Sequence, residues 1–155
     1  MNLSDNLSPH FTLGELVHTS HRTIDNTPNE EIILSLTQLC VKFLEPIRNK
    51  FGSLRVNSGY RSPALNKAIG GSKTSAHMFG CAADIVSSTI KLQTITNWLI
   101  EESNLDYDQI ILESSSTSNW LHIGMAKPGG ISRKEVLIFN KGKYTKYDKN
   151  IDYGI

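Results

Sequence analysis

The sequence predicts an α+β fold, with helices packed on a small, mostly antiparallel sheet. One long segment has apolar residues at helical spacing, and several short apolar segments of strand type lie between turn signals. The 155 residues contain neither an internal repeat nor a linker. Because a chain of this length has room for one hydrophobic core, we expect a single domain over residues 1–155.

The main helix is predicted to begin near residue 27. Thr27 fits the N-cap, Pro28 fits the first helical position, and Glu30 completes a Thr-x-x-Glu capping box. Apolar residues then recur at helical spacing: Ile32, Ile33, Leu36, Leu39, Cys40, Phe43, Leu44, Ile47 and Phe51. Pro46 should bend this helix or end it near Glu45, and Gly52 closes the segment.

The other elements are shorter. Helices are expected at 11–17, 63–69 and 90–102, the second of them stopped by the glycine pair 70–71. Strands are expected at 54–58, 82–86, 107–113 and 120–125, the last two joined by the polar loop 114–119. A C-terminal hairpin is expected over 136–147. These segments alternate in a way that favours one sheet with helices against it.

Composition excludes several classes of protein. The net charge is +1, from 16 basic and 15 acidic residues, which predicts no nucleic-acid partner. No apolar run is long enough for membrane insertion, and the N-terminus shows no signal peptide, so we expect synthesis in the cytoplasm. Cys40 and Cys81 are too few for a disulfide framework and are interpreted as buried small residues.

Three residues have the chemistry of a metal site. His77 and Asp84 flank a glycine-containing loop that runs into a strand, and His122 lies on a later strand. Two imidazoles and a carboxylate, with a fourth position left to water, are typical ligands of a catalytic zinc ion. Residue types alone leave the alternative open that these are a hydrogen-bonded loop histidine and a surface carboxylate.

A wider pattern surrounds these residues. It comprises Ser-Gly-Tyr-Arg-Ser at 58–62, Asn66, Gly-Gly-Ser at 70–72, Ser-x-His-x-x-Gly-x-Ala-x-Asp at 75–84, and Trp-x-His at 120–122. Together they resemble the superfamily of zinc D-Ala-D-Ala carboxypeptidases and L-alanyl-D-glutamate endopeptidases, and more closely its short phage and bacterial members. The resemblance covers about residues 11–125.

The resemblance implies one zinc ion held by His77, Asp84 and His122. It also implies that Arg61 holds a substrate carboxylate or stabilises the developing oxyanion. Ser75 is expected to orient substrate or loop backbone, and Trp120 to form a substrate-facing wall or to pack in the core. Zinc would polarise the scissile carbonyl and activate a water.

The general base departs from the superfamily pattern. Many members carry Asp or Glu three residues before the last histidine ligand, where this chain has Asn119. If 107–113 and 120–125 form a hairpin, Glu113 faces Trp120 and lies diagonally from His122 on the same face. We therefore predict that Glu113 is the base, with Asp108 as the second candidate.

The predicted function is hydrolysis of a peptide bond in peptidoglycan stem peptides by a zinc-activated water. Either the D-Ala-D-Ala or the L-Ala-D-Glu bond fits the resemblance. A monomeric, endolysin-like enzyme that acts on the cell wall after release is the expected form. The alternative is a zinc-containing cell-wall-binding or virion-structural module that lost catalysis at Asn119.

Overall fold

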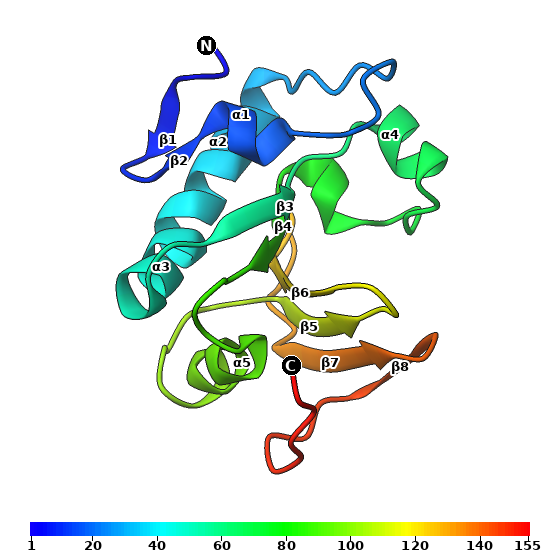
Figure 1. The fold of residues 1–155 in the computed structure, drawn as a ribbon. Helices are drawn as coiled ribbons and strands as arrows, with labels where there is room; N and C mark the ends of the chain where they lie inside the picture. Colours follow the sequence, from blue (N-terminus) through cyan, green and yellow to red (C-terminus); the bar gives the residue numbers. More distant parts are fainter.

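The computed structural model describes residues 1–155 and contains a six-stranded mixed sheet. Helices pack against this sheet (Figure 1). The strands of this sheet are β3 (Arg55–Ser58), β4 (Ala82–Val86), β5 (Gln109–Ser114), β6 (Asn119–Gly124), β7 (Glu135–Asn140) and β8 (Lys143–Lys146). Their order across the sheet is β3-β4-β6-β5-β7-β8. All neighbouring pairs are antiparallel except β5 and β7. The predicted α+β class with a mostly antiparallel sheet is confirmed.

The helices are short, apart from one long helical segment. They are α1 (Leu13–Val17), α2 (Glu30–Leu39), the π-helical turn η1 (Cys40–Leu44), α3 (Glu45–Phe51), α4 (Pro63–Ala68), the 3-10 helix η2 (Ala76–Phe79) and α5 (Leu92–Glu101). A two-stranded sheet of β1 (Asn6–Ser8) and β2 (Phe11–Thr12) precedes them and was not predicted. None of the helices has both the length and the apolar run that a bilayer span requires.

The start of the long helical segment differs from the prediction. Its N-cap is Asn29, whose side chain accepts the backbone N–H of Ile32 at 2.9 Å. Thr27 is still outside the helix, where its own N–H bonds to the carboxylate of Asp25. The predicted capping box at Thr27 is therefore wrong, because Asn29 is a strong competing cap only two residues later.

Pro46 does not end the helical segment. The turn η1 precedes it, and in this turn the Glu45 N–H reaches back five residues to the Cys40 carbonyl. The wider turn shifts the hydrogen bonds just before the proline, whose ring would clash with the preceding turn of a regular α-helix. The segment then continues as α3 to Gly52, as predicted, where φ is +91°.

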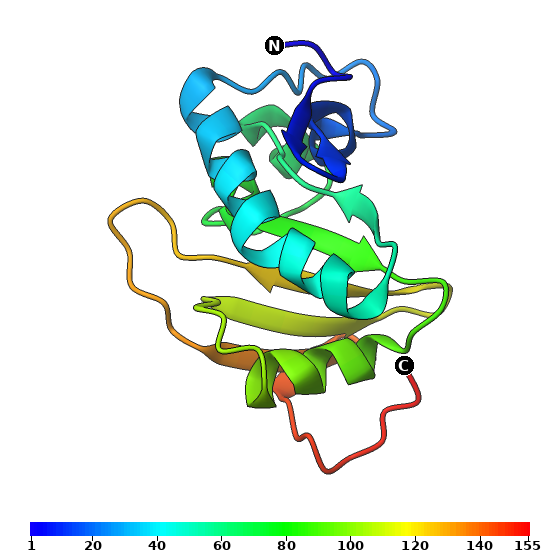
Figure 2. The same ribbon diagram turned by 90° about the vertical axis from the view of Figure 1, so that its left-hand side faces the viewer.

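The two faces of the sheet have different surroundings. Figure 2 looks onto the face that is covered by α2, η1, α3 and, lower down, α5. Alternate strand residues point into this core and are almost fully buried: Ala83, Ile85, Ile110, Leu112, Leu121, Ile123 and Ile138. The residues between them point to the other face, which has no covering helix layer. That open face positions the candidate site.

Candidate metal centre and active site

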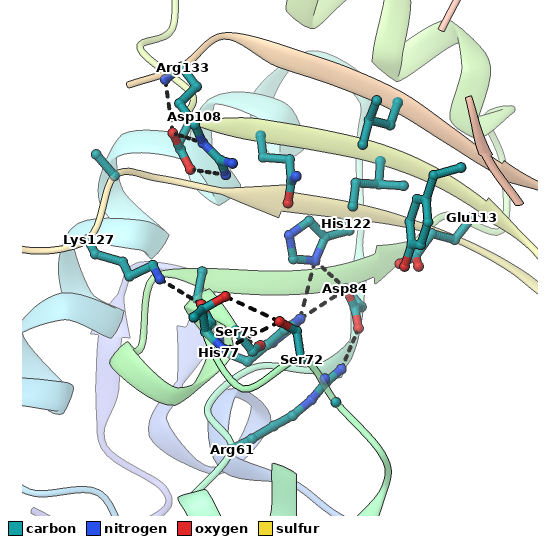
Figure 3. Close-up of a pocket in the computed structure, with 18 of the residues that line it drawn as sticks. Arg61, Ser72, Ser75, His77, Asp84, Asp108, Glu113, His122, Lys127 and Arg133 are labelled. Carbon is teal, nitrogen blue, oxygen red and sulfur yellow. Dashed lines mark hydrogen bonds and ion pairs between the residues drawn. The ribbon is translucent and has the colours of Figure 1, made fainter. Parts of the chain in front are cut away.

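Two histidines and an aspartate meet on the open face of the sheet (Figure 3). His77 comes from η2, Asp84 from β4 and His122 from β6, and the β4–β6 register sets Asp84 directly opposite His122. Asp84 Oδ1 lies 3.0 Å from His122 Nδ1 and 3.3 Å from His77 Nε2, and the two nitrogens are 3.2 Å apart. All three residues are buried.

These separations fit a tetrahedral zinc ion. Ligand atoms about 2.0–2.1 Å from such an ion stand about 3.3 Å from one another. Hydrogen bonds alone explain the cluster poorly, because two imidazole nitrogens and one carboxylate oxygen point at a common centre. His77, Asp84 and His122 form the one group of donor side chains in the chain with metal-site geometry. The three residues could hold a metal ion.

A hydrogen bond on the side away from the cluster fixes the orientation of the His77 ring. Its Nδ1 lies 2.7 Å from the Gly59 carbonyl oxygen, so this nitrogen carries the proton and Nε2 presents its lone pair to the centre. The Ser75 hydroxyl accepts the His77 backbone N–H at the start of η2. Gly80 ends η2 at a φ of +67°, which a residue with a side chain rarely adopts.

Arg61 holds the other oxygen of the aspartate. Its Nη2 donates to Asp84 Oδ2 at 3.0 Å, and its Nε donates to the Ser58 hydroxyl at 3.0 Å. The guanidinium is mostly buried beside the cluster. Arg61 therefore turns Asp84 Oδ1 toward the histidines, while its Nη1 forms no hydrogen bond within the chain.

The ionisation of the cluster also suits a cation. Burial lowers the pKa of His77, and the neighbouring Asp84 only partly offsets this, so the imidazole stays neutral. Burial opposes the charge on Asp84, but its polar contacts in the cluster, including the hydrogen bond with His122, outweigh burial and hold the pKa of Asp84 well below its usual range. A neutral imidazole and an ionised carboxylate are the forms that bind metals.

Glu113 lies beside the cluster on the same face. It pairs across the β5–β6 ladder with Trp120, whose indole N–H donates to its Oε2 at 2.5 Å. Burial raises the pKa of Glu113, and the negative charge of Asp84 raises it further. The register and face predicted for Glu113 agree with the structure, although the loop joining β5 to β6 spans only residues 115–118.

The other two candidate positions differ from Glu113. Asn119 is exposed at the start of β6 and does not line the cavity. Asp108 does line it, but Arg133 occupies both of its oxygens: Oδ1 accepts the Arg133 backbone N–H and Nε, and Oδ2 accepts Nη2 at 2.8 Å. Glu113 is thus the one of the three that combines a carboxylate with freedom from a cationic partner.

The cluster opens into a cavity of about 710 Å³. Arg61, Ser75, Glu113 and Trp120 line it together with the three donors, so the cavity brings together all seven predicted site residues. The sequence reasoning missed the part of the wall that follows residue 125, which includes Lys127, Ile131, Arg133, Leu137 and Tyr144. Of this wall, the sequence indicated only the hairpin at 136–147, which contains Leu137 and Tyr144.

Comparisons with known proteins place this site in a family. Comparison with curated protein sequences finds no significant match. A family model described as Peptidase M15 matches residues 9–124. This range is more than half of the chain and contains His77, Asp84 and His122, and peptidases of this family depend on a metal ion. The resemblance to the zinc D-Ala-D-Ala carboxypeptidase superfamily is therefore confirmed, and the chain belongs to the peptidase M15 family.

Proposed function

We propose that the protein is a zinc-dependent peptidase that hydrolyses a peptide bond in peptidoglycan stem peptides. The observation that carries this proposal is the zinc-like spacing of His77, Asp84 and His122 inside an open cavity that also contains Glu113. A structural zinc site is usually closed by four protein ligands, whereas three ligands facing a cavity leave a position for water. Family membership supports the choice of a peptidase.

Glu113 is the proposed general base. When bound, zinc supplies a Lewis acid that polarises the scissile carbonyl and acidifies a water molecule. Glu113 takes a proton from the attacking water and passes it to the leaving amine. The raised pKa of Glu113 lies closer to the pH at which the enzyme works, which makes the carboxylate a better proton acceptor. The Trp120 indole N–H holds the carboxylate in place.

Arg61 and Ser75 complete the proposed site. The Nη1 of Arg61 is free to donate to the carbonyl oxygen as negative charge develops there, or to a substrate carboxylate. Ser75 caps η2 with its hydroxyl and also lines the cavity, so it positions His77 and contacts the peptide. Trp120 forms part of the cavity wall next to Glu113.

The substrate class rests on the family and on the open cavity. Two bonds fit, the D-Ala-D-Ala link and the L-Ala-D-Glu link. Action as an endolysin-like enzyme remains a prediction of the same proposal. The bond is identified by the masses of the fragments released from purified peptidoglycan.

The test uses purified peptidoglycan, turbidity clearing and mass spectrometry of the released muropeptides. Wild type should release fragments, and a chelator or His122→Ala should abolish release. Glu113→Gln should slow release by about a hundredfold or more, as loss of a general base does. Glu102→Gln, which changes an exposed carboxylate after α5, is the matched control and should leave the rate unchanged.

One result would overturn the proposal. A wild-type protein that binds zinc yet releases nothing from any wall type is not a peptidase of this class. The chain would then be a zinc-containing binding module, the alternative that Asn119 raises.

A further inference from the structure

One wall of the cavity comes from outside the family region. The family model ends at residue 124, and the wall is formed by the loop from β6 to β7 and by the β7–β8 hairpin. Lys127, Ile131 and Arg133 of the loop line one end of the cavity. Figure 3 shows Lys127 and Arg133 on one side of the metal cluster and Glu113 on the other. The two ends of the cavity thus have opposite chemistry.

Among the cations that line the cavity, Lys127 alone has no acidic partner. Arg61 pairs with Asp84 at 3.0 Å, and Arg133 pairs with Asp108 at 2.8 Å and lies 3.8 Å from Glu135. No carboxylate oxygen lies within salt-bridge distance of Lys127 Nζ. Its charge is therefore unmatched within the chain.

The Lys127 ammonium is nevertheless held in a defined position. Its Nζ donates to the Thr74 carbonyl oxygen at 2.6 Å and lies 5.1 Å from the centre of the Phe79 ring. Thr74 and Phe79 flank the segment that carries His77, so Lys127 is anchored to the same segment as a metal ligand. An ammonium has three donors, and the carbonyl uses only one of them.

We propose that the Lys127 end of the cavity is a subsite for a carboxylate of the substrate peptide. This inference rests on the proposed peptidase function. A positioned ammonium that keeps two free donors and faces a cavity binds a carboxylate by charge-assisted hydrogen bonds. Asp108, the acidic side chain at this end, does not compete because Arg133 neutralises it.

The subsite also gives the bound peptide a direction. The substrate carboxylate lies toward Lys127, and the opposite end of the peptide lies toward Glu113, with the scissile bond at the metal cluster between them. Tyr144 shares the Glu113 end, because strand register sets both residues in one row. Stem peptides carry several carboxylates, and the bond that is cut depends on which of them Lys127 binds.

The experiment pairs enzyme variants with peptide variants. Synthetic stem peptides are prepared in which each carboxylate in turn is replaced by a carboxamide. kcat/KM of the zinc-loaded enzyme is measured for wild type, Lys127→Met and Lys127→Arg. Lys73→Met is the matched control, because Lys73 lies on the adjacent loop but is exposed and does not line the cavity.

We expect one carboxamide peptide to be about tenfold poorer than its parent for wild type, mainly through KM. Lys127→Met should show the same loss on the parent peptide and no further loss on that carboxamide. Lys127→Arg should restore part of the discrimination, and Lys73→Met should match wild type. Equal losses on all peptides, or no loss, would overturn the subsite.

Binding separates this inference from the proposed function. Calorimetric titration of the same peptides into Glu113→Gln and into Glu113→Gln/Lys127→Met measures the subsite without turnover. If wild type cleaves no peptide but binding still depends on Lys127 and on one carboxylate, the subsite stands and the peptidase function fails. If the peptides are cleaved but their affinity does not depend on Lys127, the proposed subsite is wrong and the peptidase function still stands.

Discussion

The two faces of the sheet differ most clearly within a single strand. In β6, Leu121 and Ile123 point into the helix-covered core and are fully buried. Trp120 and His122 alternate with them and line the cavity on the open face. The helix-covered face excludes water with apolar side chains, whereas the open face holds buried imidazoles and a carboxylate around a common centre.

This difference shows how a small sheet separates stability from chemistry. Successive side chains of a strand point to opposite faces, so adjacent residues can serve unrelated purposes. Burial of Ile123 contributes to folding through the removal of apolar surface from water. His77 and Asp84 are also buried, but they turn polar atoms toward a common centre, and a metal ion at that centre would satisfy them. The open face is therefore the part whose properties should respond to metal.

Two substitutions at adjacent residues of β6 give the strongest test of the difference between the two faces. Ile123→Ala should lower the free energy of unfolding by about 2–5 kcal/mol, because it opens a cavity in a closed core. His122→Ala should abolish hydrolysis by removing one of three metal donors. Thermal unfolding with and without zinc, together with the peptidoglycan assay, distinguishes the two effects.

Zinc is the control for that pair. A metal that binds only the folded state raises the melting temperature of the protein. Zinc should stabilise wild type and Ile123→Ala by similar amounts and His122→Ala far less. If zinc stabilises His122→Ala as much as wild type, the ion is held elsewhere and the assignment of the cluster is wrong.

The sequence predicted the part of the open face around Glu113 well. Strand alternation and a hairpin between β5 and β6 were enough to place Glu113 opposite Trp120, because register follows from pattern and turn position. The cap at Asn29 was missed because two good caps stand two residues apart, and a local pattern cannot rank them. The parallel pairing of β5 with β7 depends on tertiary packing and has no local signal.

The cavity wall after residue 125 was missed for a related reason. Lys127 and Tyr144 belong to no motif, and neither residue type at its position suggests a site. Their role depends on the path of the loop between β6 and β7, which brings them to the open face. Only the fold brings them together with the cluster.

A second prediction concerns the free energy of unfolding and its dependence on pH. Burial, followed by the charge of Asp84, raises the pKa of Glu113 in the folded protein. A raised pKa means that the folded state binds this proton more tightly than the unfolded state. The resulting stabilisation is complete below the unfolded pKa, about 4.3, and is lost as the pH rises through the folded pKa.

Glu113→Gln should therefore raise the melting temperature of the metal-free protein at pH 7, by about 2–4 °C for each kcal/mol gained. The gain should shrink as the pH falls toward 4, where wild type is also neutral at this position. Thermal unfolding in a chelator over this pH range measures it. A Glu113→Gln protein that is less stable than wild type at pH 7 would show that the folded state does not raise the pKa of Glu113.

A smaller effect is expected at the sheet edge. Glu113, Phe139 and Tyr144 are paired in one row across β5, β7 and β8, and the Tyr144 ring packs on Phe139 with centroids 4.5 Å apart. Tyr144 lines the cavity, so we expect its hydroxyl to contact the bound peptide. Tyr144→Phe should lower kcat/KM by about threefold to tenfold, the effect of one hydrogen bond.

Tyr147 provides the matched control for this substitution. It is buried, and its hydroxyl donates to the Asn97 side chain at 2.6 Å rather than facing the cavity. Tyr147→Phe should cost about 1 kcal/mol of stability and leave kcat/KM unchanged. The contribution of Tyr144 would be refuted if the two variants had the same kinetic constants.

The smallest effect is predicted at Asn119, where the superfamily pattern suggests the largest. His122 lies three residues later in the same regular strand, so the Asn119 side chain points away from the face that carries His122. A carboxylate there would be exposed at the strand end and could not reach the attacking water. Asn119→Asp should therefore change kcat/KM by less than about twofold and should not rescue Glu113→Gln. If a Glu113→Gln/Asn119→Asp double variant regained activity, the residue at position 119 would be the base. The register of β6 would then have to shift to bring that side chain to the face that carries His122.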